Sequence, residues 1–162
     1  MAHPEQRDFL LSLKRKFPSF FREKKVLDIG SLNINGTARD FFDNSVYTGI
    51  DIGLGSGVDV VARGESFGAP DDSFDVVLSC ECFEHNPAWR ETFINMTRLC
   101  RPQGLLFFTC ATDGRSKHGT SEQSPSSSPL TISEKSNYYK NLNEMDFSSW
   151  INLNDYFSEY QF

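Results

Sequence analysis

Short apolar runs separated by helical patterns fill the first two thirds of the chain. Each run is too short for a helix, and apolar residues on both faces are expected of strands buried in a parallel sheet. The predicted strands cover residues 24–30, 45–53, 57–62, 74–80 and 105–111. Helices are predicted at about 36–42 and from Asn86 to Cys100, where Pro87 suits a first turn and residues 101–104 end the helix. Strands that alternate with helices predict an α/β fold.

Two further segments flank this alternating region. Residues 5–16 place their apolar side chains on one helical stripe, which predicts an N-terminal helix lying against the domain. Residues 113–137 are rich in serine, glycine and proline and predict a long loop. Because a loop of this length inside a compact domain is usually functional or disordered, we expect it to be mobile and to cover an acceptor site as a lid.

The C-terminal residues return to regular structure in the prediction. The pattern favours a helix over residues 141–153, capped by Asn143 or Asn141. Residues 156–162 alternate aromatic and polar side chains, which predicts a strand at the very end.

Composition and charge narrow the class of protein. The 162 residues carry a net charge of −6, and 38% of them are hydrophobic, which fits one globular domain. Residues 1–25 hold seven Lys and Arg against three Asp and Glu, which leaves nine against nineteen for the rest. The acidic body argues against a nucleic-acid partner, and the basic start is typical of a solvated helix face.

The absence of long apolar runs and of paired cysteines indicates where in the cell the protein is found. No stretch of 18 apolar residues occurs, and the N-terminus mixes charged with apolar residues, so we predict neither a membrane span nor a secretory signal. The four cysteines lack C-x-x-C spacing and are expected to be reduced, mostly buried thiols. The protein is therefore predicted to be soluble and cytoplasmic.

The best candidate for a binding site lies where the first predicted strand ends. Asp28 to Ser31 close this strand, and Asn35 and Gly36 open the next helix, so a glycine-containing turn lies at the edge of the sheet where α/β proteins bind ligands. Asp51 ends the second strand, where an acid can accept hydrogen bonds from a ribose. A nicotinamide fingerprint, G-x-G-x-x-G, is absent because only Gly30 and Gly36 are present.

These residues belong to a longer series of motifs. The runs VLDIGSLNING, YTGIDIGLGSGVDVV, DDSFDVVLSCECFEH and RPQGLLFFTCAT, within residues 24–112, resemble the sequential motifs of class I S-adenosylmethionine-dependent methyltransferases. GRSKHGT, SSSPLT and YYKNLNEMDF resemble an uncharacterised bacterial subgroup of the methyltransferase type 11 kind. The predicted cofactor set is Asp28, Gly30, Ser31, Asn35, Gly36, Asp51, Ile52, Gly64, Glu65, Cys80 and Glu81.

The resemblance implies a role for each part of this set. The residues after the first strand lie by the methionine moiety of the cofactor, Asp51 binds the ribose hydroxyls, Gly64 and Glu65 lie near the adenine, and the pair after the fourth strand flanks the cofactor. Two positions depart from the family pattern: Leu32 stands where a second glycine is common, and Arg63 stands where an acid is frequent.

Candidates for the chemistry follow from the needs of methyl transfer. An in-line displacement requires alignment and exclusion of water, and a base only when the acceptor must lose a proton. His85 is the predicted base, and His118, Tyr138 and Tyr139 are the predicted acceptor-side residues. Glu81, Glu84 and His85 form an E-x-x-E-H run that suits a divalent metal. We nevertheless expect no metal, with Glu84 and His85 capping the following helix or facing solvent.

The resulting prediction is a single methyltransferase domain over residues 1–162. Its parts are an N-terminal helix (1–23), a cofactor-binding core (24–112), a loop or lid (113–137) and a C-terminal helix and strand (138–162). The fold class is α/β: a Rossmann-like, doubly wound, mostly parallel sheet with helices on both faces. The resemblance implies a seven-stranded sheet, so the final antiparallel strand is expected to be truncated.

The predicted function is S-adenosylmethionine-dependent methyl transfer to a small-molecule acceptor, with no nucleic-acid or membrane partner. One alternative is a non-catalytic binding or partner module that retains the fold. An NAD(P)-dependent oxidoreductase is a weaker alternative, because the glycines of the nicotinamide fingerprint are missing. The sequence predicts neither the acceptor nor the oligomeric state.

Overall fold

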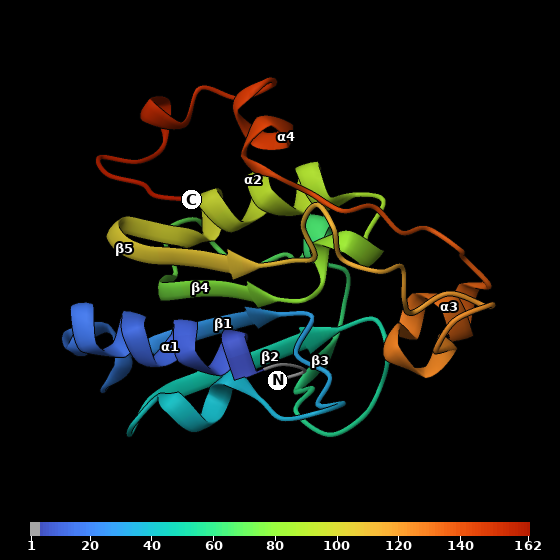
Figure 1. Ribbon diagram of the computed structural model, residues 1–162. Coiled ribbons are helices and arrows are strands. Elements are labelled where there is room, and N and C mark those ends of the chain that lie inside the picture. The colour runs from blue at the N-terminus through green and yellow to red at the C-terminus, as the bar shows by residue number, and fades with distance from the viewer. Residues whose placement is uncertain (1–3) are drawn as a thin grey trace.

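The computed structural model describes residues 4–162 and contains one five-stranded sheet. The predicted single domain begins at residue 1, so its first three residues lie outside the described range. The strands are β1 (Lys25–Ile29), β2 (Val46–Asp51), β3 (Val60–Val61), β4 (Phe74–Cys80) and β5 (Cys100–Thr109). Their order is β3-β2-β1-β4-β5, and all four neighbouring pairs are parallel (Figure 1). The predicted α/β fold with a mostly parallel sheet is confirmed.

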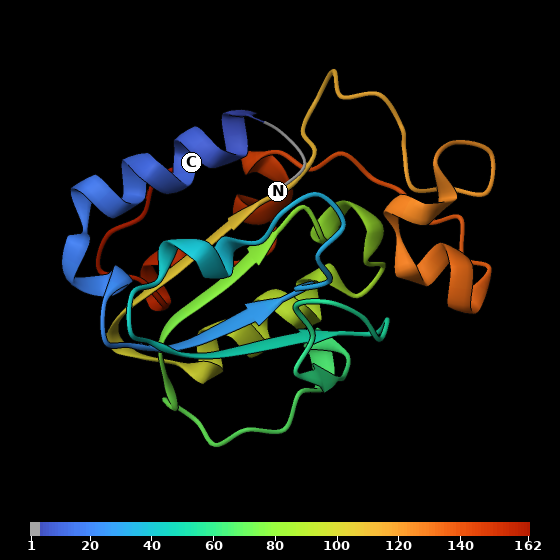
Figure 2. The same ribbon diagram turned by 90° about the horizontal axis from the view of Figure 1, so that it is seen from below.

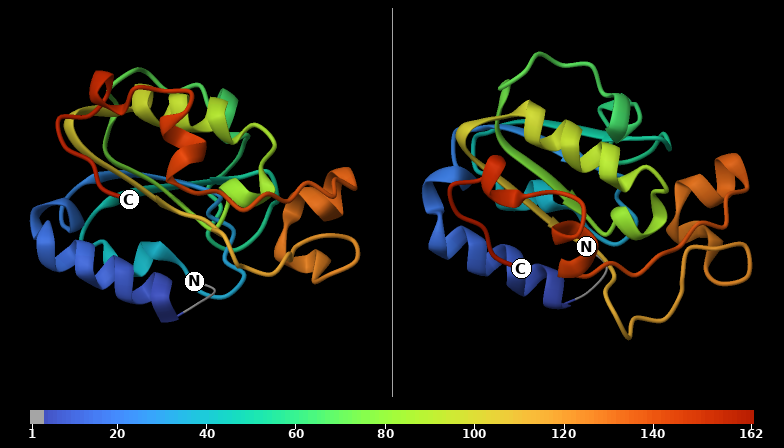
Figure 3. Two further views of the ribbon diagram at one scale, coloured as in Figure 1. Left: turned by 45° about the horizontal axis from the view of Figure 1, so that its top comes forward. Right: turned by 90° about the horizontal axis from the view of Figure 1, so that it is seen from above.

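Helices cover both faces of this sheet. Figures 2 and 3 show α1 (Pro4–Lys16) on one face and α2 (Trp89–Leu99) on the other. Neighbouring residues of a strand point to opposite faces, so Val26 packs with Leu10 of α1, whereas Leu27 packs with Phe93 of α2. Within residues 4–162, no helix has both the length and the apolar character needed to cross a membrane.

The helix predicted at residues 36–42 is only a single 3₁₀ turn, η2 (Ala38–Phe41). The side chain of Asn33 accepts a hydrogen bond from the backbone N–H of Gly36 at 2.7 Å, and Gly36 has a φ of +116°. The turn occupies the first residues of the predicted helix, so only a single helical turn remains before β2 begins. The N-terminal helix α1 covers the face instead, since Leu10, Phe21 and Phe41 share one buried cluster.

The predicted helix from Asn86 begins three residues later and passes directly into β5. Residues 101–104, which were expected to end the helix, belong to the start of this strand. They form an irregularity opposite Asp75, where the register of β4 against β5 shifts. Arg101 pairs with the Asp75 carboxylate at 2.5 Å, and Gln103 adopts a φ of +60°.

The C-terminal region packs beside α2 and contains a shorter helix than predicted. Helix α4 (Glu144–Ser148) begins at a capping box in which Asn143 accepts from the N–H groups of Met145 and Asp146, which confirms Asn143 as the cap. After α4, the short turn η6 (Leu153–Asp155) follows.

The strand predicted at residues 156–162 is wrong. None of these residues is in a strand, and β5 is one of the two edge strands of the sheet in the described chain, with β3 at the other edge. Their aromatic side chains pack onto the domain instead: the ring of Phe157 lies 6.1 Å from that of Phe93, and the ring of Phe162 lies 5.6 Å from that of Phe147. Aromatic alternation thus serves ring packing here, not pairing with the sheet edge.

Residues 113–137, called the cap segment below, lie beyond the carboxyl ends of the strands (Figure 1). The segment contains two short helical pieces, η5 (Pro125–Ser127) and α3 (Pro129–Glu134). The hydroxyl of Thr131 donates to the carbonyl of Gly119, and Leu130 is buried. The predicted loop therefore includes regular structure of its own.

Removing the Leu10 side chain tests whether α1 covers the face of the sheet that the helix predicted at residues 36–42 would have covered. Leu10 is fully buried against η2 and the sheet, so Leu10→Ala is expected to lower the free energy of unfolding by about 2–5 kcal/mol. Urea denaturation measures this change. Ser12→Ala, on the exposed side of the same helix, is the matched control and should change stability little. Equal stability of the two variants would contradict a core role for α1.

Candidate active site

A cavity of about 450 Å³ lies between the carboxyl ends of the strands and the cap segment. Its walls come from the turn after β1, the end of β2, the turn after β4 and residues 115–130. All eleven residues of the predicted cofactor set line it. Because β1 and β4 are neighbours whose connections leave in opposite directions, this position is the switch point where open α/β sheets bind ligands.

Gly30 forms the floor of the cavity at the end of β1. Its φ is +82°, and a Cβ added there would lie 2.6 Å from the Cβ of Cys82. The N–H groups of Gly30 and Ser31 both donate to the carbonyl of Ile50, at 2.9 and 3.1 Å. The turn is thus held across the end of β2, and only glycine leaves room for the turn after β4.

Asp51 is held in place by two backbone groups. Its Oδ2 accepts from the N–H of Leu32 at 3.2 Å, and its Oδ1 accepts from the N–H of Gly53 at 2.9 Å. Burial raises the pKa of this carboxyl, and the two N–H groups lower it in part. Leu32, at the position of the common second glycine, therefore orients the acid through its backbone. Each carboxylate oxygen retains a lone pair for a hydroxyl donor.

Asp28 pairs with Tyr47, a partner that the sequence reasoning missed. The hydroxyl of Tyr47 donates to Asp28 Oδ2 at 2.8 Å, whereas Oδ1 is buried without a partner. Burial raises the pKa of Asp28 to about 6, although the Tyr47 hydrogen bond and the charge of Arg39 lower it. The signal in the sequence was only a tyrosine in the neighbouring strand, two positions before Gly49, the register partner of Asp28.

The cavity wall at Gly64 and Glu65 packs on α2 and contacts the cap segment. Asn95 donates to the carbonyl of Gly64 at 2.7 Å, and a Cβ on Gly64 would lie 2.7 Å from Ile29. Arg63 pairs with Glu65 at 3.7 Å and also with Glu134 of α3. The basic residue that departs from the family pattern therefore joins this wall to the cap segment.

Two thiols and a carboxylate lie at the end of β4 and in the turn after it. Cys80, Glu81 and Cys82 line the cavity, and Glu81 has a left-handed φ of +55° while its N–H donates to the carbonyl of Thr109. Burial raises the pKa of both thiols well above the usual range. They are therefore neutral groups that shape the cavity, not nucleophiles.

Glu84 and His85 neither cap α2 nor face solvent, which contradicts the expectation for them. They belong to the 3₁₀ turn η4 (Phe83–His85), and the N-cap of α2 is Ala88, which has no side-chain cap. Glu84 is fully buried, and His85 is 8% exposed and lines the cavity. The reason is Phe83, whose ring packs 5.0 Å from that of Phe108 and so turns the next two side chains inward.

Burial has opposite effects on these two groups. It raises the pKa of Glu84 to about 8, with help from the charge of Glu81, while the N–H of Ala111 lowers it in part. Burial and the neighbouring His118 lower the pKa of His85 to about 4. At neutral pH the imidazole of His85 is therefore uncharged.

The predicted acceptor-side residues divide into two groups. His118 of the cap segment lines the cavity, but Tyr138 and Tyr139 do not. Tyr139 packs behind the histidines, with ring centroids 5.4 Å from His85 and 5.1 Å from His118. Tyr138 packs against the core on the α2 side of the sheet.

The cap segment contributes cavity residues that the sequence reasoning did not single out. Ser124, Ser128 and Pro129 are among them. A Cβ on Gly53 would lie 2.8 Å from Pro129, so α3 packs directly beside the carboxylate of Asp51. The serine-rich composition indicated a functional loop, but no pattern in it identified single positions.

Comparison with known proteins identifies the family. The profile of the family described as Methyltransferase domain matches residues 27–108, about half of the chain. The chain belongs to this family, and the predicted class I S-adenosylmethionine-dependent methyltransferase relationship is confirmed. S-adenosylmethionine is the methyl donor of the family. No curated protein matches the chain in sequence.

Solved structures share the fold at low sequence identity. A phospholethanolamine N-methyltransferase 2 from Haemonchus contortus has a TM-score of 0.60 at 19% identity, over 88% of this chain and 35% of that one. A candidate sarcosine dimethylglycine methyltransferase from Galdieria sulphuraria has a TM-score of 0.57 at 21% identity, over 85% and 57%. The cyclase SpnF has a TM-score of 0.54 at 16% identity, over 72% and 48%. This chain thus spans less than two thirds of each.

The raised pKa of Asp28 predicts a pH dependence of stability. Between pH 4 and 6 the folded carboxyl holds a proton that the unfolded chain has lost, so wild-type stability falls as pH rises through this window. Asp28→Asn carries no charge and avoids this loss. Its stability relative to the wild type should therefore grow with pH, by roughly 3 kcal/mol in total.

Urea denaturation at a series of pH values checks this. Tyr47→Phe removes a hydrogen bond that lowers the pKa of Asp28, so its decline in stability should extend to higher pH than that of the wild type. Parallel stability curves for the wild type and Asp28→Asn would show that burial does not perturb this carboxyl.

Proposed function

We propose that this chain transfers the methyl group of S-adenosylmethionine to a small-molecule acceptor under the cap segment. The observation that carries the proposal is the convergence of the whole predicted cofactor set on one cavity at the switch point of the sheet. Family membership supports the choice of cofactor. A cavity of about 450 Å³, within the usual range of small-molecule sites, supports a small acceptor.

The residues present fit this cofactor in three ways. The turn at Gly30 leaves a cradle that any Cβ would fill. Two buried polar atoms at the site, Asp28 Oδ1 and Ser31 Oγ, have no hydrogen-bond partner in the protein and so remain open to a ligand. Asp51, fixed by two N–H groups, presents acceptor oxygens for the ribose hydroxyls.

The chain's own residues would bind and orient the cofactor and the acceptor, and they would exclude water. S-adenosylmethionine supplies an activated methyl group when bound. In our proposal Gly30 and Ser31 hold its methionine part, Gly64 and Glu65 lie by the adenine, and the carboxylates of the cavity stabilise its positive charge. The cap segment shields the reacting atoms from water.

The predicted base, His85, has one property that suits proton removal and one that does not. Its imidazole is neutral and lines the cavity, so it can accept a proton from an acceptor. A pKa of about 4 makes it a weak base, however, because general bases work best with a pKa near the operating pH. The base role of His85 is therefore a proposal limited to acceptors that must lose a proton.

We also propose that the protein works in the cytoplasm and without a nucleic-acid partner. All four cysteines are free, which suits a reducing compartment. The net charge of −6 would oppose binding to a phosphate backbone.

Loss of Asp51 tests the cofactor site. Asp51→Ala removes a charged hydrogen-bond acceptor worth about 1.5–3 kcal/mol, so we expect the dissociation constant of S-adenosylhomocysteine to rise roughly 10- to 150-fold. Isothermal titration calorimetry measures it. Glu91→Gln, on the exposed face of α2, is the control and should bind like the wild type. Unchanged affinity in a folded Asp51→Ala variant would place the ribose elsewhere.

The same titration with the wild type separates the alternative functions. Binding of S-adenosylhomocysteine without binding of NADH supports a methyltransferase. Binding of neither would support a non-catalytic module, and binding of NADH would support an oxidoreductase.

A further inference from the structure

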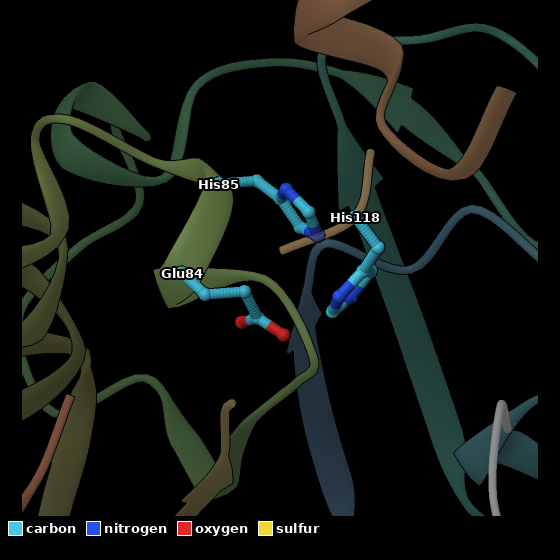
Figure 4. A group of neighbouring side chains, drawn as sticks. All are labelled: Glu84, His85 and His118. Carbon is cyan, nitrogen blue, oxygen red and sulfur yellow. The ribbon is translucent and has the colours of Figure 1, made fainter. Parts of the chain in front are cut away.

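We propose that Glu84, His85 and His118 form a divalent metal site that joins η4 to the cap segment. One ligand atom from each residue lies within 4.8 Å of the other two. Figure 4 shows the carboxylate of Glu84 and the two imidazole rings pointing toward one shared space. Residues 84 and 85 come from the turn after β4, whereas His118 comes from the cap segment, so the fold brings distant parts of the chain together here.

Burial without partners is the second observation. Glu84 is fully buried, and neither of its carboxylate oxygens makes a hydrogen bond of ordinary geometry; only nearby backbone N–H groups, such as that of Ala111, and the charge of Arg115 offset its burial. Nδ1 of His85 is also buried and unpartnered. Leaving such groups unpaired in the interior costs free energy, and buried carboxylates are usually paired or bound to a metal. A cation between these three side chains would satisfy all of them at once.

The surroundings orient the two imidazoles as ligands. Nδ1 of His118 lies 3.1 Å from the carbonyl of Ser116, and since a carbonyl only accepts, this nitrogen carries the proton and leaves Nε2 for a metal. The ring of Tyr139 packs edge-on against both imidazoles. Gly119, at a φ of +63°, brings the cap segment so close that a Cβ there would lie 2.5 Å from His85.

The donor set indicates the class of metal. Two imidazole nitrogens and one carboxylate oxygen suit Zn²⁺ and related transition metals, whereas Mg²⁺ and Ca²⁺ prefer oxygen ligands. Ligand atoms around a tetrahedral Zn²⁺ lie roughly 3.3 Å apart, so binding would draw the three side chains closer together. His118 is on the cap segment, and the metal would therefore fasten this segment over the cavity.

The site also changes the role of His85. Three protein ligands would leave a fourth position on a tetrahedral metal, and two of the three ligands, His85 and His118, line the cavity. A metal there would hold a water or an oxygen of the acceptor, and His85 would act as a ligand in place of a free base. The proposal does not depend on the proposed function, because metal binding is measured without cofactor or acceptor.

Titration of the metal-stripped protein with Co²⁺ tests the site. We expect one Co²⁺ per chain, with the visible absorption of a nitrogen- and oxygen-coordinated ion, and its displacement by Zn²⁺ but not by Mg²⁺. Glu84→Gln and His118→Ala should each weaken Co²⁺ binding at least 100-fold. Glu122→Gln, an exposed carboxylate of the cap segment, is the matched control and should bind like the wild type.

Three outcomes would overturn the proposal: no stoichiometric binding, binding that survives both ligand variants, or displacement by Mg²⁺. Since Glu84→Gln alters a buried side chain, His118→Ala on the half-buried cap segment keeps the test valid if the former does not fold. Loss of methyl transfer in His85→Ala alone, with no metal bound to the wild type, would leave His85 as a base.

Limited trypsin digestion tests the fastening of the cap segment. Lys117 lies next to His118, so saturating Zn²⁺ should slow cleavage there at least tenfold in the wild type and leave the rate in His118→Ala unchanged. Equal cleavage of the wild type with and without Zn²⁺ would show that the metal does not join the cap segment to η4.

Discussion

The close approach of two turns at the centre of the sheet governs the rest of the site. The turn after β1 crosses the end of β2 through two hydrogen bonds to Ile50, and the turn after β4 presses Cys82 against Gly30. Interiors pack densely and transmit such constraints to neighbouring groups. Because Cys82 is fixed by this contact, η4 starts at a defined position, and Phe83 enters the core while Glu84 and His85 turn toward the cavity.

The cap segment completes the cavity through packing more than through charge. The ion pair between Arg63 and Glu134 joins two half-exposed side chains, and pairs of this kind contribute about 1 kcal/mol or less. The contacts of Pro129 with Gly53 and of Gly119 with His85 leave no space for a Cβ. These two glycines therefore set how closely the segment can approach the strand ends.

How far the sequence predicts this structure depends on how local each signal is. The strands were predictable because apolar runs are local, and the cofactor set converges because parallel strands end at one edge. The inward turn of Glu84 and His85 was not predictable, since it follows from the packing of Phe83 in three dimensions. Residues 156–162 show the opposite case, in which a local pattern predicted a strand that does not form. Their aromatic side chains alternate, but they pack against other rings of the domain.

The acidic groups around the cavity lower the stability of the folded chain. Burial raises the pKa of Asp28, Asp51 and Glu84. Each of these carboxyl groups therefore destabilises the folded state when it is ionised in the interior. A domain selected for stability alone would replace such groups by apolar ones. A positively charged ligand reverses this balance, because it stabilises the ionised form of every carboxylate it faces. Under the functions proposed above, the buried acids at this edge of the sheet complement the positive charge of a bound ligand.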